Sequence, residues 1–157
     1  MNKPSYLFSI RQARRSDCPA CQRLGRVPEI AIAPKWYLPL AYYQAVVRGK
    51  HIFLVTFINN KIIGFIIAEK IVAGYLSQYV VVSKTYRHRG IGRALLEAME
   101  KEAQRRGAYF LLAYAVTNNV YIQKLHRQLG WRSSHVTREW TKGLAQNPRP
   151  GKLGAPK

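Results

Sequence analysis

The chain has 157 residues, of which 48% are hydrophobic, so it is long and apolar enough to fold as one domain around a buried core. This composition excludes a disordered chain. The longest apolar run, from Ile62 to Ala68, is too short to cross a bilayer. Arg11, Arg14 and Arg15 interrupt the apolar stretch that a signal peptide requires, so we expect a cytoplasmic protein with no membrane partner.

The first half of the chain alternates between strand and helix patterns and then forms a hairpin. Pro39 is expected in the first turn of its helix, because a helix interior does not tolerate proline. Asn59 and Asn60 join the two hairpin strands, since asparagine accepts the positive φ angles of a tight turn. The predicted elements are a strand over 8–13, a helix over 17–24, a loop over 25–34, a helix over 36–48, and strands over 51–58 and 61–69.

The second half predicts two strand–helix pairs and a last strand. Gly107 ends the clearest helix, and Asn118 or Asn119 caps the final one. The predicted elements are a strand over 75–82, a helix over 92–106, a buried strand over 109–115, a helix that ends near Gln128 and a strand over 131–140. Residues 1–142 are expected to form the domain, and residues 143–157, rich in Gly and Pro, a basic disordered tail.

A basic loop with two glycines, Arg87-His88-Arg89-Gly90-Ile91-Gly92, connects the strand over 75–82 to the helix that follows. The first N–H groups of a helix have no intrahelical partner and carry partial positive charge, so this position favours an anion. Gly90 and Gly92 permit positive φ and let a phosphate approach the backbone. The loop therefore predicts a pyrophosphate site, to which full charges are added by Arg87, Arg89 and Arg93.

The spacing of this loop separates it from two common phosphate-binding patterns. It is not that of a P-loop, and Leu95 stands where a dinucleotide-binding fold needs Gly or Ala. The loop resembles instead the acetyl-CoA signature of the GCN5-related N-acetyltransferase (GNAT) superfamily, [Arg/Gln]-x-x-Gly-x-[Gly/Ala]. Asn119 and the phrase Leu129-Gly130-Trp131 extend the resemblance, which is specific from Leu76 to Trp131.

The resemblance implies one α/β (α+β) domain with a mixed central sheet of about six strands, flanked by about four helices and splayed at the cofactor site. It implies that acetyl-CoA is the co-substrate and that the acetyl group passes directly to an acceptor amine. Strand residues would bind the pantetheine arm, and the N–H groups from Arg89 to Ala94 would hold the pyrophosphate. The implied cofactor-binding residues are Val80, Val81, Val82, Arg87, His88, Arg89, Gly90, Ile91, Gly92, Arg93, Ala94 and Asn119.

The resemblance also implies candidates for the catalytic residues. Many family members place a tyrosine acid four residues before the Gly of the Gly-Phe phrase, and His126 stands there in this chain. His126 is either the acid or a polar residue on a basic helix. Tyr114 is the reserve acid, or a core residue. Tyr121 is not an obvious substitute, because it lies roughly 140° around the helix from His126. Glu69 is either the base, acting through water, or an ordinary charge at the end of a strand. Glu29 is the other candidate for the base.

Cys18 and Cys21 form a lone C-x-x-C with no further ligands nearby, so we expect no metal site. A redox pair is possible from the position, but two small residues at the start of a helix are the favoured interpretation. The aromatic residues at 36, 37, 42 and 43 fit an acceptor pocket, a homodimer surface or plain core.

Lys and Arg total 26 against seven Asp and Glu, a formal net charge of +19. Such a charge favours acidic surfaces such as RNA, although ordinary solubility explains it equally well. Three functions follow. The first is an N-acetyltransferase for a protein, peptide or small-molecule amine, and the second is an acetyltransferase whose acceptor is carried on RNA, such as aminoacyl-tRNA or a ribosomal component. The third is a non-catalytic acyl-CoA or RNA-binding module. Basic clusters are expected near the first helix, from Arg14, Arg15, Arg23 and Arg26, and near the last elements, from Lys124, Arg127, Arg132 and Arg138.

Overall fold

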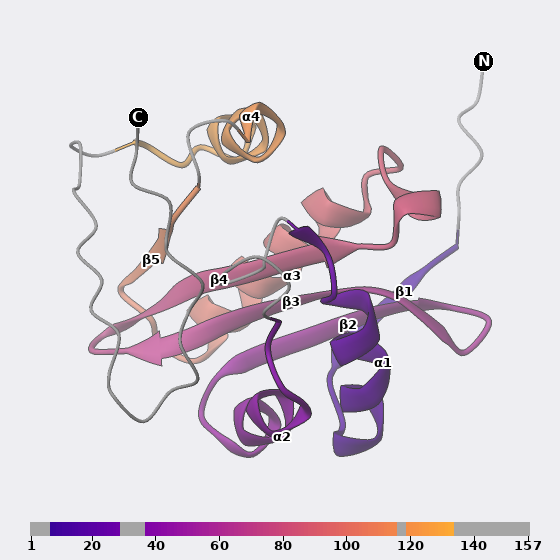
Figure 1. Ribbon diagram of the computed structural model, residues 1–157. Helices are drawn as coiled ribbons and strands as arrows, with labels where there is room; N and C mark the ends of the chain where they lie inside the picture. Colours follow the sequence, from indigo (N-terminus) through magenta and orange to yellow (C-terminus); the bar gives the residue numbers. More distant parts are fainter. Residues whose placement is uncertain (1–6, 29–36, 116–118, 134–157) are drawn as a thin grey trace, which may run out of the picture.

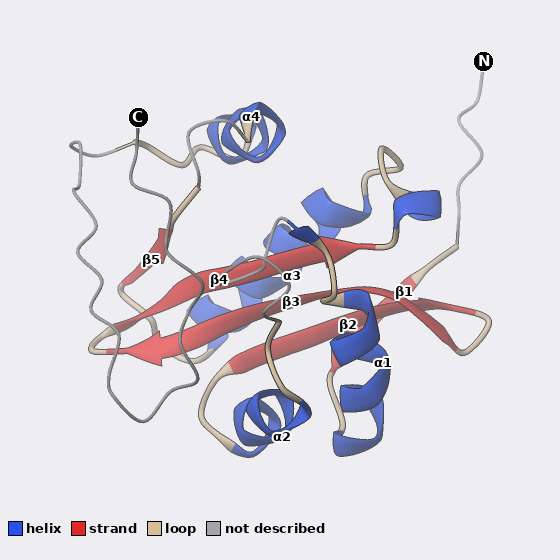
Figure 2. Cartoon of the chain, in the orientation of Figure 1, coloured by secondary structure: helices blue, strands red, loops and turns tan. Residues whose placement is uncertain are grey.

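The computed structural model describes residues 7–28, 37–115 and 119–133, and these form a five-stranded sheet with helices on both faces (Figures 1 and 2). The strand order is β1-β2-β3-β4-β5; neighbours from β1 to β4 are antiparallel, and β5 is parallel to β4. The elements are β1 (Ser9–Gln12), η1 (Arg15–Asp17), α1 (Cys18–Leu24), α2 (Leu40–Arg48), β2 (Ile52–Ile58), β3 (Lys61–Ile71), β4 (Gly74–Val82), η3 (Lys84–Tyr86), α3 (Ile91–Arg105), β5 (Phe110–Ala113) and α4 (Val120–Gln128).

The mixed, helix-flanked architecture expected from the sequence is thereby confirmed. The strand predicted over 131–140 lies almost entirely outside the described residues, as do Glu29 and the predicted tail. No helix in the described part of the chain has the length and apolar character needed to cross a membrane.

Two apolar clusters hold the helices against the sheet. Leu95, Leu96 and Met99 of α3 are buried on one face against Ile52 and other strand residues. On the opposite face, α1 and α2 bury Cys18, Cys21 and Tyr43 against Phe53 and Phe65. Both cysteines are free, and burial raises the pKa of each thiol, most of all that of Cys21, which disfavours the thiolate form. Their place in the structure is that of packed apolar residues.

Local chemistry explains the turns and the one displaced helix start. Asn59 and Asn60 have φ angles of 46° and 62°, which confirms the tight hairpin turn between β2 and β3. The second predicted helix begins later than expected, because Pro39 is extended (φ −71°, ψ 159°) and precedes Leu40, the first helical residue. Pro39 is therefore the N-cap of α2 and does not lie in its first turn.

The prediction of a buried strand over 109–115 is wrong on burial. β5 covers only Phe110–Ala113, and Phe110 and Leu112 are 43% and 44% exposed. Phe110 and Leu112 lie on the same face of β5, because successive side chains of a strand point to opposite faces, and this face is the exposed one. Among the described strands, β5 also has a neighbour on one side alone. An apolar sequence does not distinguish a central strand from an edge strand.

β4 and β5 pair only at the beginning of β4, and this is the feature that creates the site. Their register runs from Gly74↔Phe110 to Ser77↔Ala113, after which β4 continues to Val82 without β5. A register shift between Ile67 and Ala68 of β3 coincides with this point and leaves Gln78 as an extra residue on β4. The expected splay of the sheet is thus present in the described strands.

Candidate functional site

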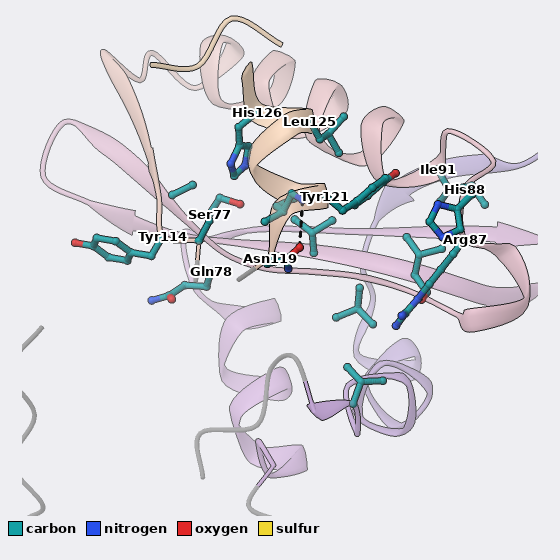
Figure 3. A pocket seen from close by; sticks show the side chains of 18 of the residues that line it. Ser77, Gln78, Arg87, His88, Ile91, Tyr114, Asn119, Tyr121, Leu125 and His126 are labelled. Atoms are coloured by element: carbon teal, nitrogen blue, oxygen red, sulfur yellow. Dashed lines mark hydrogen bonds between the residues drawn. The ribbon is translucent and has the colours of Figure 1, made fainter. Parts of the chain in front are cut away.

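A cleft of about 910 Å³ opens where β4 and β5 separate (Figure 3). Its walls come from β4 beyond Ser77, the loop that leads into α3, the end of β5 and one side of α4. Val27 and Pro28, which follow α1, complete one side. The cleft therefore joins a helix N-terminus to the part of the β4 edge that β5 leaves unpaired.

The helix N-terminus at this cleft has the geometry of an anion site. Gly90 is the N-cap of α3 with a φ of +82°, and His88 also has a positive φ, 62°. The bond from Ala94 N–H to the Gly90 carbonyl is 3.0 Å long, so the N–H groups of residues 91–93 precede the helical ladder. At Gly92 an added Cβ would meet nothing closer than 4.0 Å, which leaves open space at the cleft wall. A diphosphate fits this cradle.

The three arginines around the N-terminus of α3 do not all face the cleft. Arg87 lines it and donates from Nε to the Val82 carbonyl at 3.0 Å, which ties the loop to the end of β4. The Arg89 guanidinium lies over the Tyr86 ring, 5.4 Å from its centroid. Arg93 forms an ion pair with Glu97 on the helix surface, at 2.9 Å. The tertiary structure thus places only the first of these charges at the cleft wall.

The predicted contact residues of β4 and α4 also meet in the cleft. Val80, Val81 and Val82 line it along the part of β4 that pairs with β3 but not with β5. Asn119 lines it from the opposite side, and its Oδ1 accepts from the Ile122 N–H at 3.2 Å, which confirms the predicted N-cap. Its side chain therefore combines a structural role with a position at the cleft.

His126 lines the same cleft, and Figure 3 shows its imidazole directed from α4 toward Ser77 of β4. The ring stacks on the Trp131 indole, with centroids 4.8 Å apart and planes 24° apart. The Nε2 atom is buried and has no hydrogen-bond partner within the described part of the chain. Burial lowers the pKa of His126 below the usual 6.5, so the imidazole is neutral at pH 7.

Tyr114 and Tyr121 both line the cleft, and neither is a core residue. Tyr114 is 71% exposed, at the end of β5. Tyr121 makes an edge contact with the His88 ring, with centroids 5.5 Å apart, whereas His126 lies toward the other end of α4 (Figure 3). The angle between Tyr121 and His126 on the helix did not exclude Tyr121 from the site, because the cleft follows the length of α4.

Glu69 is placed differently from the other candidates. It is not among the residues that line the cleft, and its carboxylate accepts from the Tyr42 hydroxyl at 2.6 Å. Burial, together with this bond to Glu69, raises the pKa of Tyr42 well above its usual range. A role for Glu69 as a base stays a prediction.

Sequence reasoning missed several residues of the cleft. Ser77 is 6% exposed and lines the cleft, and the polar pair Ser77-Gln78 in a largely apolar strand was the available signal. Gln78 enters the lining through the register shift, for which the sequence has no marker. The stacking of Trp131 on His126 depends on how the chain turns after α4.

A family model described as "Acetyltransferase (GNAT) family" matches residues 10–131. The fold is similar to that of the ribosomal-protein-S18-alanine N-acetyltransferase from Escherichia coli, with a TM-score of 0.70, 22% identity, and coverage of 82% of this chain and 80% of that one. yncA from Salmonella typhimurium, solved with its cofactor acetyl-CoA, has a TM-score of 0.70 and 24% identity, with 79% of each chain covered. The aminoglycoside 6'-N-acetyltransferase AAC(6')-IG from Acinetobacter haemolyticus has a TM-score of 0.67 and 16% identity, with 87% and 99% covered. No curated protein sequence matches the chain.

Proposed function

Because the chain belongs to the acetyltransferase (GNAT) family, whose co-substrate is acetyl-CoA, we propose that it transfers an acetyl group from acetyl-CoA directly to an acceptor amine. The observation that carries the proposal is the continuous cleft, which runs from the N-terminus of α3 along the unpaired edge of β4 to His126. An extended pantetheine chain with a diphosphate at one end requires both of these features.

The residues that would hold acetyl-CoA divide into two groups. Backbone N–H groups at the start of α3, with Arg87, would bind the diphosphate, because a helix N-terminus and a nearby cation favour a doubly charged anion, and His88 lines the cleft beside them. Backbone groups of Val80–Val82 would bind the amides of the pantetheine arm and polarise the thioester carbonyl. Asn119 would contact the arm from α4.

Acetyl transfer forms a bond between the amine nitrogen and the thioester carbon, and breaks the bond between that carbon and sulfur. The nitrogen must lose a proton, and the departing sulfur must gain one. His126 and Tyr114 are the proposed proton-handling residues, because both line the cleft near the place where β4 and β5 separate.

The acceptor that we propose is an α-amino group, such as a peptide N-terminus. An α-amine has a pKa of about 8, against about 10.4 for a lysine side chain, so a useful fraction is neutral without a strong base. This suits a cleft whose lining, within the described residues, contains no Asp or Glu. The Escherichia coli structure noted above is that of an enzyme for a ribosomal-protein alanine, which supports the same class of acceptor.

Two measurements test this function in order. A melting curve with acetyl-CoA at about a hundredfold excess over its dissociation constant should show about 2.7 kcal/mol of added stability. Release of free CoA thiol is then followed with an alanyl peptide, an N-terminally blocked lysyl peptide and an aminoglycoside. Turnover with the alanyl peptide alone is expected. Turnover only with the aminoglycoside would contradict the proposed acceptor.

One observation favours a second candidate, an acceptor amine carried on RNA. Every Asp and Glu in the described part of the chain is already held by an internal bond, and no Lys or Arg in that part is buried, so the excess positive charge lies at the surface. Aminoacyl-tRNA in the same assay tests this candidate, together with RNA binding that weakens steeply as salt rises. Acetyl-CoA binding without turnover of any acceptor would favour a non-catalytic module instead. The internal bonds are Asp17–Arg11, Glu69–Tyr42, Glu97–Arg93, Glu100–Trp131, Glu102–Arg105 and Glu102–Arg106.

A further inference from the structure

We propose that His126 performs both proton transfers of the reaction, and that Trp131 and Glu100 are positioning residues that hold its imidazole for this purpose. The proposal rests on the function proposed above and assigns the step that the sequence left without a base. One histidine would then replace two separate residues, an acid and a base.

The first support is the chain of contacts behind His126. Trp131 stacks on the imidazole, and its backbone N–H donates to the His126 carbonyl at 3.0 Å. The Trp131 indole N–H donates in turn to Glu100 of α3 at 2.5 Å. α3 is packed on the sheet through its buried face, so the imidazole is connected through Trp131 to a helix that is part of the core.

The second support is the unpartnered state of the ring. Nε2 of His126 is buried, yet it has no partner among the described residues, and a buried polar atom without one is costly. The ring lies at the wall of the cleft and is directed toward Ser77, beside the point where β4 and β5 separate (Figure 3). The substrates would supply the missing partner.

The third support is the charge state of the imidazole. Burial keeps His126 neutral at pH 7, and the negative charge of Glu100 limits the decrease in its pKa. A neutral imidazole accepts a proton, whereas a residue that acted only as an acid would need to be protonated beforehand. The other titratable side chains that line the cleft are Tyr86, Arg87, His88, Tyr114 and Tyr121, and Lys124 and Arg127 lie near His126 on α4.

The step balances without a further reactant. As the amine nitrogen bonds to the thioester carbon, Nε2 of His126 accepts one nitrogen-bound proton. The carbon–sulfur bond then breaks, and the imidazolium gives the same proton to the sulfur, which leaves as the CoA thiol. His126 returns to its neutral form, so the cycle needs no other base.

The decisive variant is His126→Tyr, because tyrosine is the usual acid of the family at this position. With a pKa of about 10, tyrosine can donate a proton but does not accept one near pH 7. We expect H126Y and the matched H126Q to lose about 100-fold or more in kcat with the alanyl peptide, while acetyl-CoA affinity and melting temperature are retained. Full activity of H126Y at pH 7 would overturn the double role.

The positioning residues are tested by the pH profile of kcat and by NMR titration of His126. Activity should fall as pH drops through the His126 pKa, because the accepting form is lost. Glu100→Gln keeps an acceptor for the indole and removes the negative charge. The pH at which kcat falls and the His126 pKa measured by NMR should therefore both decrease. Trp131→Leu exposes the His126 imidazole. The pH at which kcat falls and the His126 pKa should then both rise toward about 6.5, and kcat should be lower.

The possible outcomes separate this proposal from the proposed function. If Trp131→Leu and Glu100→Gln change the melting temperature but not the pH at which kcat falls, the two residues are only structural and the positioning role is wrong. A wild-type His126 that titrates above about 6.5 would also contradict it. These NMR readings need no acceptor, so absence of turnover with every amine would count against the proposed function, not against the geometry of His126.

Discussion

Gly90 and Gly92 lie two residues apart at the start of α3, yet the backbone needs glycine at only one of them. Gly90 has a φ of +82°, a conformation that L side chains rarely adopt. Gly92 is helical, and the space where its Cβ would lie is open toward the cleft. The first glycine is therefore required for the fold of the loop, and the second leaves room for a ligand.

This difference predicts opposite effects for two alanine variants. Gly90→Ala should lower the free energy of unfolding by about 1–2 kcal/mol, because its residue must stay in the left-handed region. Gly92→Ala should raise it by up to about 1 kcal/mol and still weaken acetyl-CoA binding, since the methyl group enters the phosphate cradle. Urea unfolding and calorimetric titration measure the two quantities. Unchanged acetyl-CoA affinity in G92A would show that the diphosphate does not approach this point.

Asn119 allows the cap of α4 to be separated from ligand binding. Its Oδ1 accepts from the Ile122 N–H, so Asn119→Ala should cost about 1 kcal/mol of stability. Asn119→Asp keeps an equally good cap but adds a negative charge beside the cleft. We expect N119D to match the wild type in thermal unfolding and to bind acetyl-CoA more weakly. Equal affinity in N119D would place Asn119 outside the cofactor site.

Tyr42 and Glu69 connect α2 to β3 through a bond of 2.6 Å. Tyr42→Phe should lower the free energy of unfolding by about 1–2 kcal/mol, because the partly buried carboxylate loses its donor. Glu69→Gln keeps an acceptor for the Tyr42 hydroxyl, so it should cost less stability than Tyr42→Phe, with a decrease in kcat much smaller than that of H126Q. A 100-fold loss of kcat in a stably folded E69Q would instead support Glu69 as the base.

Glu102 makes the pH dependence of stability testable at the far end of α3. Hydrogen bonds from Arg105 and Arg106 lower its pKa from 4.5 to about 2. A carboxyl with a lowered folded-state pKa stabilises the protein above pH 4.5, and this contribution is lost as pH falls from 4.5 toward 2. Glu102→Gln should therefore cost about 1–2 kcal/mol at pH 7, and the difference from the wild type should vanish near pH 2.

Glu97→Gln is the matched control for this pH experiment. Glu97 also pairs with an arginine on α3, at 2.9 Å, but the side chains of both partners are more than 40% exposed. An exposed pair contributes less than about 0.5 kcal/mol. A pH-dependent loss of equal size in E97Q and E102Q would show that the lowered pKa of Glu102 has no measurable effect on folding.

Features that depend on a few neighbouring residues were predictable from the sequence. The turn at Asn59 and Asn60 follows from the tolerance of asparagine for positive φ, and the cap at Asn119 from a hydrogen bond that spans three residues. The loop with Gly90 also identified the family, because its spacing is read along a single stretch of chain. In each case the interacting groups are close in the sequence.

Features that depend on contacts between distant segments were not predictable in this way. The exposure of β5, the position of Glu69 beside Tyr42 and the presence of Tyr121 in the cleft each depend on what packs nearby. The order of the elements, the glycines of the anion site and the histidine that stands in place of a tyrosine follow from the order of amino acids alone. The stacking of Trp131 on this histidine, the bond from Trp131 to Glu100 and the lowered pKa of the imidazole arise only in the folded chain, because a side chain is buried only when separate elements pack together.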